Sequence, residues 1–351
     1  TMNKKYLSIL SNLKQEDIKT QEPNDKILLI DGLNTFIRAY TVNPTVNDDG
    51  MHIGGIGGFL LSIGYAIKML KPTRVVICFD GKGGSSKRRK LYPNYKANRR
   101  VKKRITRFNS ILSRDDEKEA MHYQLHRLTE YLEQLPVTVM APENIEADDA
   151  MAYISQQVYP DSKCIIMSSD KDFLQLVDDR VQVWSPTKKK LYFPEGIFED
   201  FDVPYHNFLM YRLLKGDSSD NIPGVKGSGV KTLMKNIPII FEENKIDLDD
   251  ILKYAADNNK SKINKRISES RDILELNFEL MQLAEVDIHG IAKNEILTIV
   301  REPISRLVKF QFQKMMLEDK LNSSIKNPDL WLRTAFSHLD SMAQKRNNND
   351  R

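Results

Sequence analysis

The stretch KILLIDG, residues 26–32, is a nearly uninterrupted apolar run that ends in Asp-Gly. Such a run is typical of a parallel β-strand that is buried on both faces of a sheet. TRVVICFDG, residues 73–81, repeats the pattern, again with β-branched residues followed by Asp-Gly. Two more strands are predicted in VTVMAP (137–142) and SKCIIMSSDKDF (162–173).

Helical segments separate these predicted strands. GGFLLSIGYAIKML (57–70) has the apolar content of a helix, and 114–135 reads as a charged, amphipathic helix. VQVWSPTKKKLYF (181–193) reads as a β-hairpin, and the pattern is mainly helical after about residue 205. Strands that alternate with helices predict an α/β fold with a doubly wound, mostly parallel sheet.

The composition is that of a soluble globular protein. The chain has 351 residues, of which 40% are hydrophobic and 29% charged, and it is long enough to bury a substantial core. Apolar runs such as 59–67 are too short to span a bilayer, and no signal peptide is visible. Its two cysteines lie in β-like runs, which suggests buried thiols in a reducing compartment. We therefore expect a cytoplasmic protein with no membrane partner.

The positive charge is concentrated in one segment. Residues 82–107 contain twelve Lys and Arg and no acid, whereas the other residues hold 41 basic and 48 acidic side chains, a net of −7. A solvated surface run is one interpretation of this segment. Because Tyr92 and Tyr95 are interleaved with the cations, the segment favours phosphate neutralisation and base stacking, and hence nucleic-acid binding.

Carboxylates follow the predicted strands. Asp31, Asp80 and Asp170 each end a strand, and NIEADDAM (144–151) places three carboxylates in four positions with no basic residue beside them. Taken singly, each acid could be a turn former or a helix cap. Brought together at the carboxyl edge of a sheet, they would repel one another unless hard divalent cations compensate them. Mg²⁺ beside a basic segment predicts phosphodiester hydrolysis.

Two glycine-rich stretches have different meanings. GGIGGF (54–59) lacks the Lys-Ser/Thr of a P-loop and the dinucleotide-binding spacing, so we reject it as a nucleotide site. NIPGVKGSGVKTL (221–233) places glycines and lysines between two short helices. Backbone N–H groups can then approach phosphates closely, as in a helix-hairpin-helix that grips duplex DNA, although an inter-helix turn is the simpler alternative.

These motifs together resemble the 5′-nuclease superfamily. In order they are LLIDG, DDGMHIGGIGGF, VVICFDG, YPNYKANR, IEADDA, MSSDKDFLQL, WSP and LKGDSSDNIPGVKGSGVKTL, over roughly residues 26–236. The superfamily includes flap endonucleases, the 5′-nuclease domains of bacterial DNA polymerases, and phage 5′-to-3′ exonucleases of the phage RNase H type. The resemblance implies a PIN-like 5′-nuclease core with a helical arch, followed by a C-terminal helical part that contains a helix-hairpin-helix.

This resemblance, with the composition, predicts four regions of the chain. They are a polar N-terminal extension (1–24), an α/β nuclease core (25–204) with the basic arch at about 82–118, a helix-hairpin-helix and helical subdomain (205–310), and C-terminal helices with a disordered tail (311–351).

The resemblance also implies two metal positions at the acidic edge. The first is formed by Asp31, Asp80, Glu146 and Asp148, close to Asp170. The second, partly water-mediated, is formed by Asp149, Asp170, Asp172, Asp217 and Asp220. Two Mg²⁺ ions are the implied cofactors, with Mn²⁺ as a substitute. A K⁺ ion is implied at the stretch 221–233, which we call the glycine hairpin. Ser228 stands where the family usually has a small aliphatic residue.

The resemblance, which points to a protein of a bacterium or a phage-infected cell, also implies catalytic and DNA-binding residues. The catalytic residues are Lys87, Arg88, Lys96 and Asp148, the three cations acting on the scissile phosphate and its neighbours. The DNA-binding residues are Tyr95, which would stack the terminal base, with Lys96, Arg99, Arg100, Gly224, Gly227, Gly229 and Lys231.

The predicted function is that of a monomeric, Mg²⁺-dependent 5′ nuclease. Its substrates would be DNA with a 5′ flap or a nick and RNA–DNA hybrids, cut during the removal of primers or flaps in replication. A replication clamp or a single-strand-binding protein would be its protein partner. Two alternatives stay open: a PIN-type ribonuclease, and a catalytically silent protein that binds branched DNA.

Overall fold

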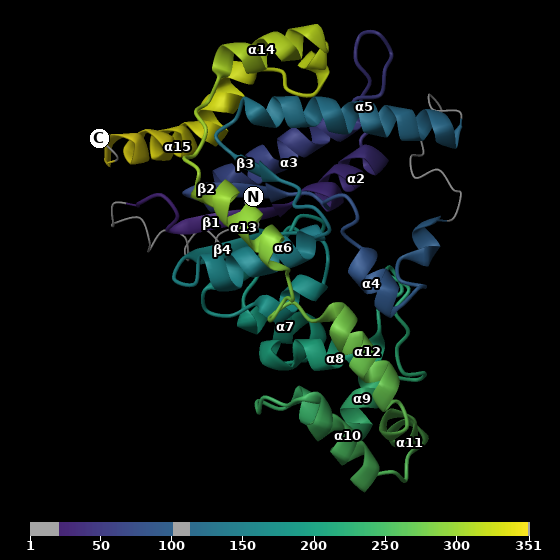
Figure 1. The fold of residues 1–351 in the computed structure, drawn as a ribbon. Helices are drawn as coiled ribbons and strands as arrows, with labels where there is room; N and C mark the ends of the chain where they lie inside the picture. Colours follow the sequence, from purple (N-terminus) through teal and green to yellow (C-terminus); the bar gives the residue numbers. More distant parts are fainter. Residues whose placement is uncertain (1–20, 101–112, 350–351) are drawn as a thin grey trace, which may run out of the picture.

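The computed structural model describes residues 21–100 and 113–349. Most of the predicted N-terminal extension and the middle of the predicted arch fall outside these residues. The structure contains a six-stranded sheet with the order β3-β2-β1-β4-β5-β6 (Figure 1). Its strands are β1 (Lys26–Asp31), β2 (Arg74–Cys78), β3 (Thr138–Met140), β4 (Lys163–Met167), β5 (Val181–Ser185) and β6 (Lys190–Tyr192).

The predicted doubly wound sheet is confirmed. β1 pairs in parallel with both β2 and β4, β3 adds in parallel to β2, and β5 adds in parallel to β4. β6 is antiparallel to β5, which is the hairpin predicted at 181–193. All six residues of β1 are buried, because both faces of this central strand are covered.

Successive residues of β1 face two separate hydrophobic clusters. Leu28 and Ile30 join the cluster formed with α2 (Gly32–Val42), α3 (Gly54–Leu70) and α5 (Arg114–Glu133). Ile27 and Leu29 join the cluster on the other face, formed with the helices α6 (Ala147–Tyr153), α8 (Phe208–Lys215) and α13 (Gly290–Arg301). The period of two along a strand therefore divides the core into two layers.

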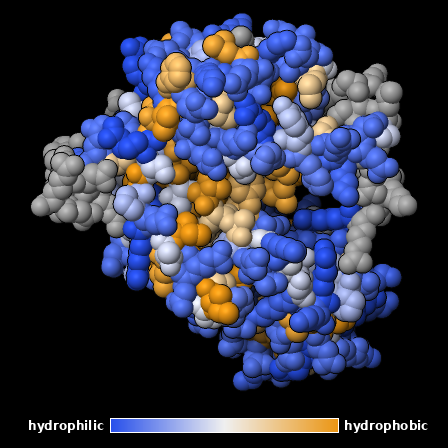
Figure 2. Space-filling view, turned by 45° about the horizontal axis from the view of Figure 1, so that its top comes forward, coloured by the Kyte–Doolittle hydropathy of each residue, from blue (hydrophilic) through white to orange (hydrophobic). Residues whose placement is uncertain are grey.

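The helical subdomain extends below the sheet in Figure 1. It contains α9 (Val230–Asn236), α10 (Leu248–Asp257), α11 (Lys262–Ser268) and α12 (Arg271–Met281), while α7 (Pro194–Phe201) precedes α8. The short helix α4 (Ser86–Leu91) from the basic segment lies against α12. The surface in Figure 2 is mostly hydrophilic, with an apolar area in the middle between the upper and lower parts of the molecule.

The C-terminal helices pack on α3, and the glycine-rich start of α3 makes room for them. α14 (Lys309–Glu318) and α15 (Pro328–Asn349) contribute Phe312, Leu332 and Phe336 to the same cluster as α3. A Cβ at Gly57 would lie 2.3 Å from the Ser324 hydroxyl, and one at Gly64 would lie 2.7 Å from the Trp331 indole nitrogen. The rejected nucleotide motif is therefore a helix-packing surface.

The C-terminal helix α15 runs through Asn349. The division of the chain into four regions stays a prediction. Among the described residues, no helix is long and apolar enough to cross a membrane. Cys78 and Cys164 are free and buried, as expected.

Candidate metal centre and nucleic-acid interface

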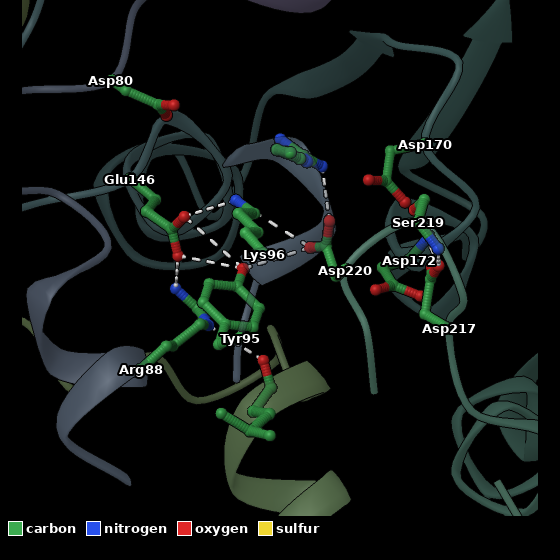
Figure 3. Close-up of polar contacts among 12 residues, drawn as sticks. Asp80, Arg88, Tyr95, Lys96, Glu146, Asp170, Asp172, Asp217, Ser219 and Asp220 are labelled. Atoms are coloured by element: carbon green, nitrogen blue, oxygen red, sulfur yellow. Dashed lines mark hydrogen bonds and ion pairs between the residues drawn. The ribbon is translucent and has the colours of Figure 1, made fainter. Parts of the chain in front are cut away.

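The sheet topology brings the predicted acids to one edge. β1 ends at Asp31, and Asp80 and Asp170 follow the neighbouring strands β2 and β4. Glu146 immediately precedes α6, which follows the third strand in the chain. Because β1 lies between β2 and β4, parallel strands deliver these carboxylates to the same edge. Figure 3 shows Asp80 and Glu146 on one side of this edge and Asp170, Asp172 and Asp217 on the other.

Both carboxylate oxygens of Asp31 accept hydrogen bonds, and these bonds hold the side chain in place. Its Oδ1 accepts a hydrogen bond from the Asn34 backbone N–H at 3.0 Å, and its Oδ2 accepts one from the Ser168 hydroxyl at 3.0 Å. The same hydroxyl oxygen accepts the Asp170 N–H at 3.0 Å, so Ser168 bridges two predicted metal ligands. Sequence reasoning missed this role, although Ser168 stands in the motif MSSDKDF that it quoted.

Asp31 and Asp148 both have a raised pKa. Burial raises the pKa of Asp31 to about 7, and the charges of Asp80 and Asp170 add to the effect. Burial, with the charges of Asp31 and Asp170, also holds the pKa of Asp148 well above its ordinary value. Asp80 is fixed by the Ala147 N–H, which donates to its Oδ1 at 2.8 Å. These carboxylates are crowded and lack enough positive charge in the protein alone.

Arg88 neutralises the charge of two other acids at the same edge, Glu146 and Asp149. Its Nη1 and Nη2 donate to the two carboxylate oxygens of Asp149, both at 2.7 Å, and Nη1 also lies 2.6 Å from Glu146 Oε2. Its Nε donates to the Leu280 carbonyl at the end of α12. The acidic stretch 144–151 has no basic neighbour in the sequence, but the fold supplies one from the basic segment.

Lys96 is a second cation beside Glu146, and it also lies near Asp220. Its Nζ lies 2.5 Å from Glu146 Oε1 and 3.8 Å from Asp220 Oδ2 (Figure 3). Its backbone N–H donates to the Asp220 carbonyl, and Arg99 forms an ion pair with the Asp220 carboxylate. Burial opposes ionisation of Glu146, but the charges of Arg88 and Lys96 outweigh it and lower the pKa of this carboxyl.

Tyr95, for which base stacking is predicted, is buried in this structure. Tyr95 is only 3% exposed, and its ring belongs to the core cluster below the sheet edge. Its hydroxyl donates toward Asp220 Oδ2 at 3.1 Å and lies 3.3 Å from Glu146 Oε2. The apolar ring gains more from burial than from exposure, so its face is closed to a base.

Three acids form a compact cluster on the other side of the edge. One oxygen from each of Asp170, Asp172 and Asp217 lies within 4.8 Å of the other two. Burial and the charge of Asp170 raise the pKa of Asp172 to about 7, although Arg212 opposes the shift. Three crowded carboxylates are a hard oxygen ligand set, so these residues fit a divalent cation.

The structure brings together three of the five acids that were predicted for the second metal position. Asp170, Asp172 and Asp217 come together, whereas Asp149 pairs with Arg88, and Asp220 pairs with Arg99 and Lys96. Arg212 contacts the cluster directly, with Nη2 at 2.7 Å from Asp172 Oδ1 and 2.5 Å from Asp217 Oδ2. Sequence reasoning missed Arg212, because a lone Arg in the apolar helix FLMYRLLK gives no signal of its partners.

The glycine hairpin lies between α8 and α9. A Cβ at Gly224 would meet the Lys215 carbonyl oxygen at 2.2 Å, and Gly227 has a φ of +96°, so both positions need glycine. Gly229 has open space around it, and Lys231 is exposed. Ser228 points inward, where its hydroxyl donates to the Leu214 carbonyl at 2.8 Å. Gly229 and Lys231 are therefore accessible for the predicted contact with duplex DNA.

The remaining arch residues are only partly described. Lys87 is exposed and forms an ion pair with Asp287 at 2.6 Å, away from the acids. The side chain of Arg100 and residues 101–112 lie outside the described residues.

Comparison with known proteins points to one family. Residues 26–202 match the model of the 5′-3′ exonuclease N-terminal resolvase-like domain. A 5′-3′ exonuclease of Bacillus subtilis (strain 168) is 29% identical over 297 residues, which cover 82% of this chain and 93% of the relative. A 5′-3′ exonuclease of Aquifex aeolicus is 27% identical, and its match covers 88% of this chain and 97% of the relative. DNA polymerase I of Rhizobium leguminosarum is 29% identical over 74% of this chain, which spans only 24% of that protein.

Solved structures share the fold. A bacteriophage T5 flap endonuclease, solved as a pseudo-enzyme-product complex with DNA and metal ions, superposes with a TM-score of 0.60 at 22% identity. The match covers 84% of this chain and 99% of that one. Human GEN1 in complex with Holliday junction DNA gives a TM-score of 0.55 at 16% identity, covering 95% of this chain and 78% of that one.

Proposed function

Because the chain belongs to the 5′-3′ exonuclease family, we propose that it is a Mg²⁺-dependent, structure-specific 5′ nuclease. Its substrates are branched or nicked DNA and RNA–DNA hybrids, cut near the 5′ end as in the removal of primers or flaps. The observation that carries the proposal is the acidic edge of the sheet, where crowded carboxylates face the cations Arg88 and Lys96. A catalytically silent DNA-binding protein would have no need to keep carboxylates at such elevated pKa values.

The acids on the sheet side are the metal ligands of this proposal. They are Asp31, Asp80, Asp148, Asp170, Asp172 and Asp217, with Glu146 at the border. Divalent cations held there supply positive charge for the scissile phosphate and for the leaving 3′ oxygen. Ser168 links the Asp31 carboxylate to the backbone of Asp170, because its hydroxyl donates to Asp31 Oδ2 and accepts the Asp170 N–H.

The cations act on the phosphate. Arg88 presents two parallel N–H groups to Asp149, and the same planar fork fits two phosphate oxygens. Lys96 holds a point charge beside Glu146, within the same edge. On substrate binding, both side chains exchange carboxylate for phosphate, and the freed acids become available to the metal ions. Arg99 contacts the neighbouring phosphate from its position beside Asp220.

The duplex and the single strand enter from different directions. Gly229 and Lys231 contact the duplex backbone, since the backbone at Gly229 is open and Lys231 is exposed. The basic segment 82–107 guides the 5′ single strand toward the acids. A bulky adduct on the 5′ terminus should then block cleavage, because the single strand could not pass along the basic segment. Undiminished cleavage would refute this guidance of the 5′ single strand. The implied K⁺ ion and the implied protein partners stay predictions.

A substitution at Asp148 tests the proposal. Asp148→Asn removes a half-buried carboxylate of the edge, so cleavage should fall by about 10³-fold while flap-DNA binding is retained. The assay compares 5′-labelled flap, nicked and RNA–DNA hybrid substrates, with Mg²⁺ and with chelator. Asp161→Asn is the matched control, because Asp161 is exposed and distant from the edge. Strong residual cleavage by Asp148→Asn, or cleavage in chelator, would contradict the metal assignment.

A further inference from the structure

Arg212 is a buried cation inside the acidic cluster of the second metal position. It stands in the last turn of α8, and its side chain is 8% exposed. Nε and Nη2 both donate to Asp172 Oδ1, at 2.9 and 2.7 Å, and Nη2 also lies 2.5 Å from Asp217 Oδ2. Nη1 donates to the Gly216 carbonyl at 3.4 Å. One guanidinium therefore ties two of the three clustered acids to the same helix end.

Further hydrogen bonds hold other oxygens of the cluster. Asp217 Oδ1 accepts from the Ser219 N–H and hydroxyl, both at 2.7 Å, while its Oδ2 faces Arg212. Asp170 Oδ1 accepts the Asp172 N–H at 2.8 Å. Each carboxylate is thus fixed through one oxygen or both, and one oxygen from each of the three groups lies within 4.8 Å of the other two. The geometry of the cluster is set before any cation arrives.

We propose that Arg212 is a positioning residue that preforms the Asp170–Asp172–Asp217 cluster and weakens its binding of a divalent cation when DNA is absent. The inference rests on the proposed metal-dependent function and deepens it. A fixed positive charge next to two ligands repels a second cation, whereas the same charge holds the ligands in register. Occupancy of this position then depends on the substrate phosphate, which adds the missing negative charge.

Arg212 differs from the other cations of the edge in one respect. Arg88, Lys96 and Arg99 come from the basic segment, which carries no acid and whose proposed partner is phosphate. Arg212 comes from the packed helix α8, whose neighbours Tyr211 and Leu213 are buried in the core. Its charge therefore stays beside Asp172 and Asp217 in every state that keeps α8 in place.

Mn²⁺ binding measured by electron paramagnetic resonance, without DNA, tests the inference. The binding event that is lost in Asp217→Asn identifies the position. Arg212→Gln removes the charge, so we expect this event to become about tenfold tighter, while Arg212→Lys should stay within about threefold of the parent protein. Arg127→Gln is the matched control, because Arg127 makes a comparable acidic network with Glu130, Glu318 and Asp319 away from the edge.

The outcomes separate the inference from the proposed function. Unchanged or weaker Mn²⁺ binding by folded Arg212→Gln would overturn the inference and leave the nuclease proposal standing. No Mn²⁺ binding by the parent protein or any variant would overturn both. Circular dichroism establishes folding, and Arg212→Met, which keeps the buried aliphatic stem, replaces Arg212→Gln if the latter is unfolded; the same tightening is expected.

Discussion

Glu146 and Asp148 stand two residues apart at the start of one helix, yet their pKa values move in opposite directions. Glu146 faces the basic segment, where Arg88 and Lys96 overcome its burial and lower its pKa. Asp148 faces the strands, where burial and the charges of Asp31 and Asp170 raise its pKa well above the ordinary value. The acidic edge therefore has an arch-facing side that is already neutralised and a sheet-facing side that is not.

This difference shows what the protein supplies and what it must acquire. On the arch-facing side, the cations that are proposed to bind phosphate form ion pairs with the carboxylates until the substrate binds. On the sheet-facing side, Arg212 pairs with Asp172 and Asp217, and the remaining neutralisation comes from protons or from divalent cations. The acidic stretch 144–151 reads as one motif in the sequence, but it spans the border between these two sides.

The largest expected effect is that of Lys96→Met, which breaks the arch-facing side. Cleavage should fall by about 10³-fold through loss of a phosphate contact. The free energy of unfolding should fall by about 3 kcal/mol in chelator, because buried Glu146 loses a charge partner. Single-turnover cleavage and urea unfolding measure the two effects.

Lys190→Met is the matched control for that prediction. Lys190 is similarly buried and paired with Asp200 at 2.7 Å, but it belongs to β6 and lies outside the acidic edge. We expect a comparable loss of stability with cleavage retained. A loss of cleavage as large as that of Lys96→Met would show that the effect reports folding and not phosphate contact.

The pH dependence of stability distinguishes the two sides without mutation. Asp31 and Asp172 have pKa values raised to about 7, against about 4 in an unfolded chain. Between these values the folded protein holds more protons than the unfolded one, so in chelator the free energy of unfolding should fall from pH 5 to pH 8. We expect a fall of at least about 1.4 kcal/mol, the equivalent of one pKa unit.

Glu146 and Asp217, whose pKa values are lowered, contribute outside that pH range. Their stabilisation is lost only as the pH falls below about 4. Saturating Mg²⁺ should flatten the slope between pH 5 and 8, since it favours the deprotonated acids. A stability that rises with pH in chelator, measured by urea unfolding, would contradict the assignment of the sheet-facing side.

Tyr95→Phe gives a smaller effect at the border between the two sides. It removes a hydroxyl that contacts Asp220 and Glu146 but keeps the buried ring, so stability should fall by about 1 kcal/mol. Because the hydroxyl contacts protein carboxylates, the affinity for single-stranded flaps should be unchanged. A tenfold weaker affinity, measured by fluorescence anisotropy, would show that this hydroxyl contributes to flap binding.

Gly229→Ala gives the smallest effect and tests the glycine hairpin. A Cβ there meets nothing within 4 Å, so stability should be unchanged while duplex affinity falls by about threefold through a wider approach to phosphate. Gly224→Ala is the contrasting variant, because its Cβ would meet the Lys215 carbonyl oxygen and should destabilise the fold. Equal behaviour of the two variants in thermal unfolding and anisotropy would argue against a duplex contact at Gly229.

The sequence predicts the sheet and its acidic edge well, because both follow local rules. Buried runs such as 26–32 identify strands, and parallel strands bring their terminal acids together. The sequence could not predict which cation neutralises which acid, because Arg88 and Glu146 are 58 residues apart and meet only through the packing of α4. The burial of Tyr95 and the position of Arg212 have the same origin, since both depend on tertiary contacts that leave no periodic signal.

The glycines of α3 have a consequence for how the chain can be divided. Gly57 and Gly64 leave a groove that Ser324 and Trp331 fill, and Phe312 and Phe336 belong to the same buried cluster as the central strand. A fragment that ends after the family-matched residues 26–202 would expose this apolar groove to water. The last two helices are thus part of the cooperative folding unit, and a minimal autonomous nuclease fragment of this chain must retain them.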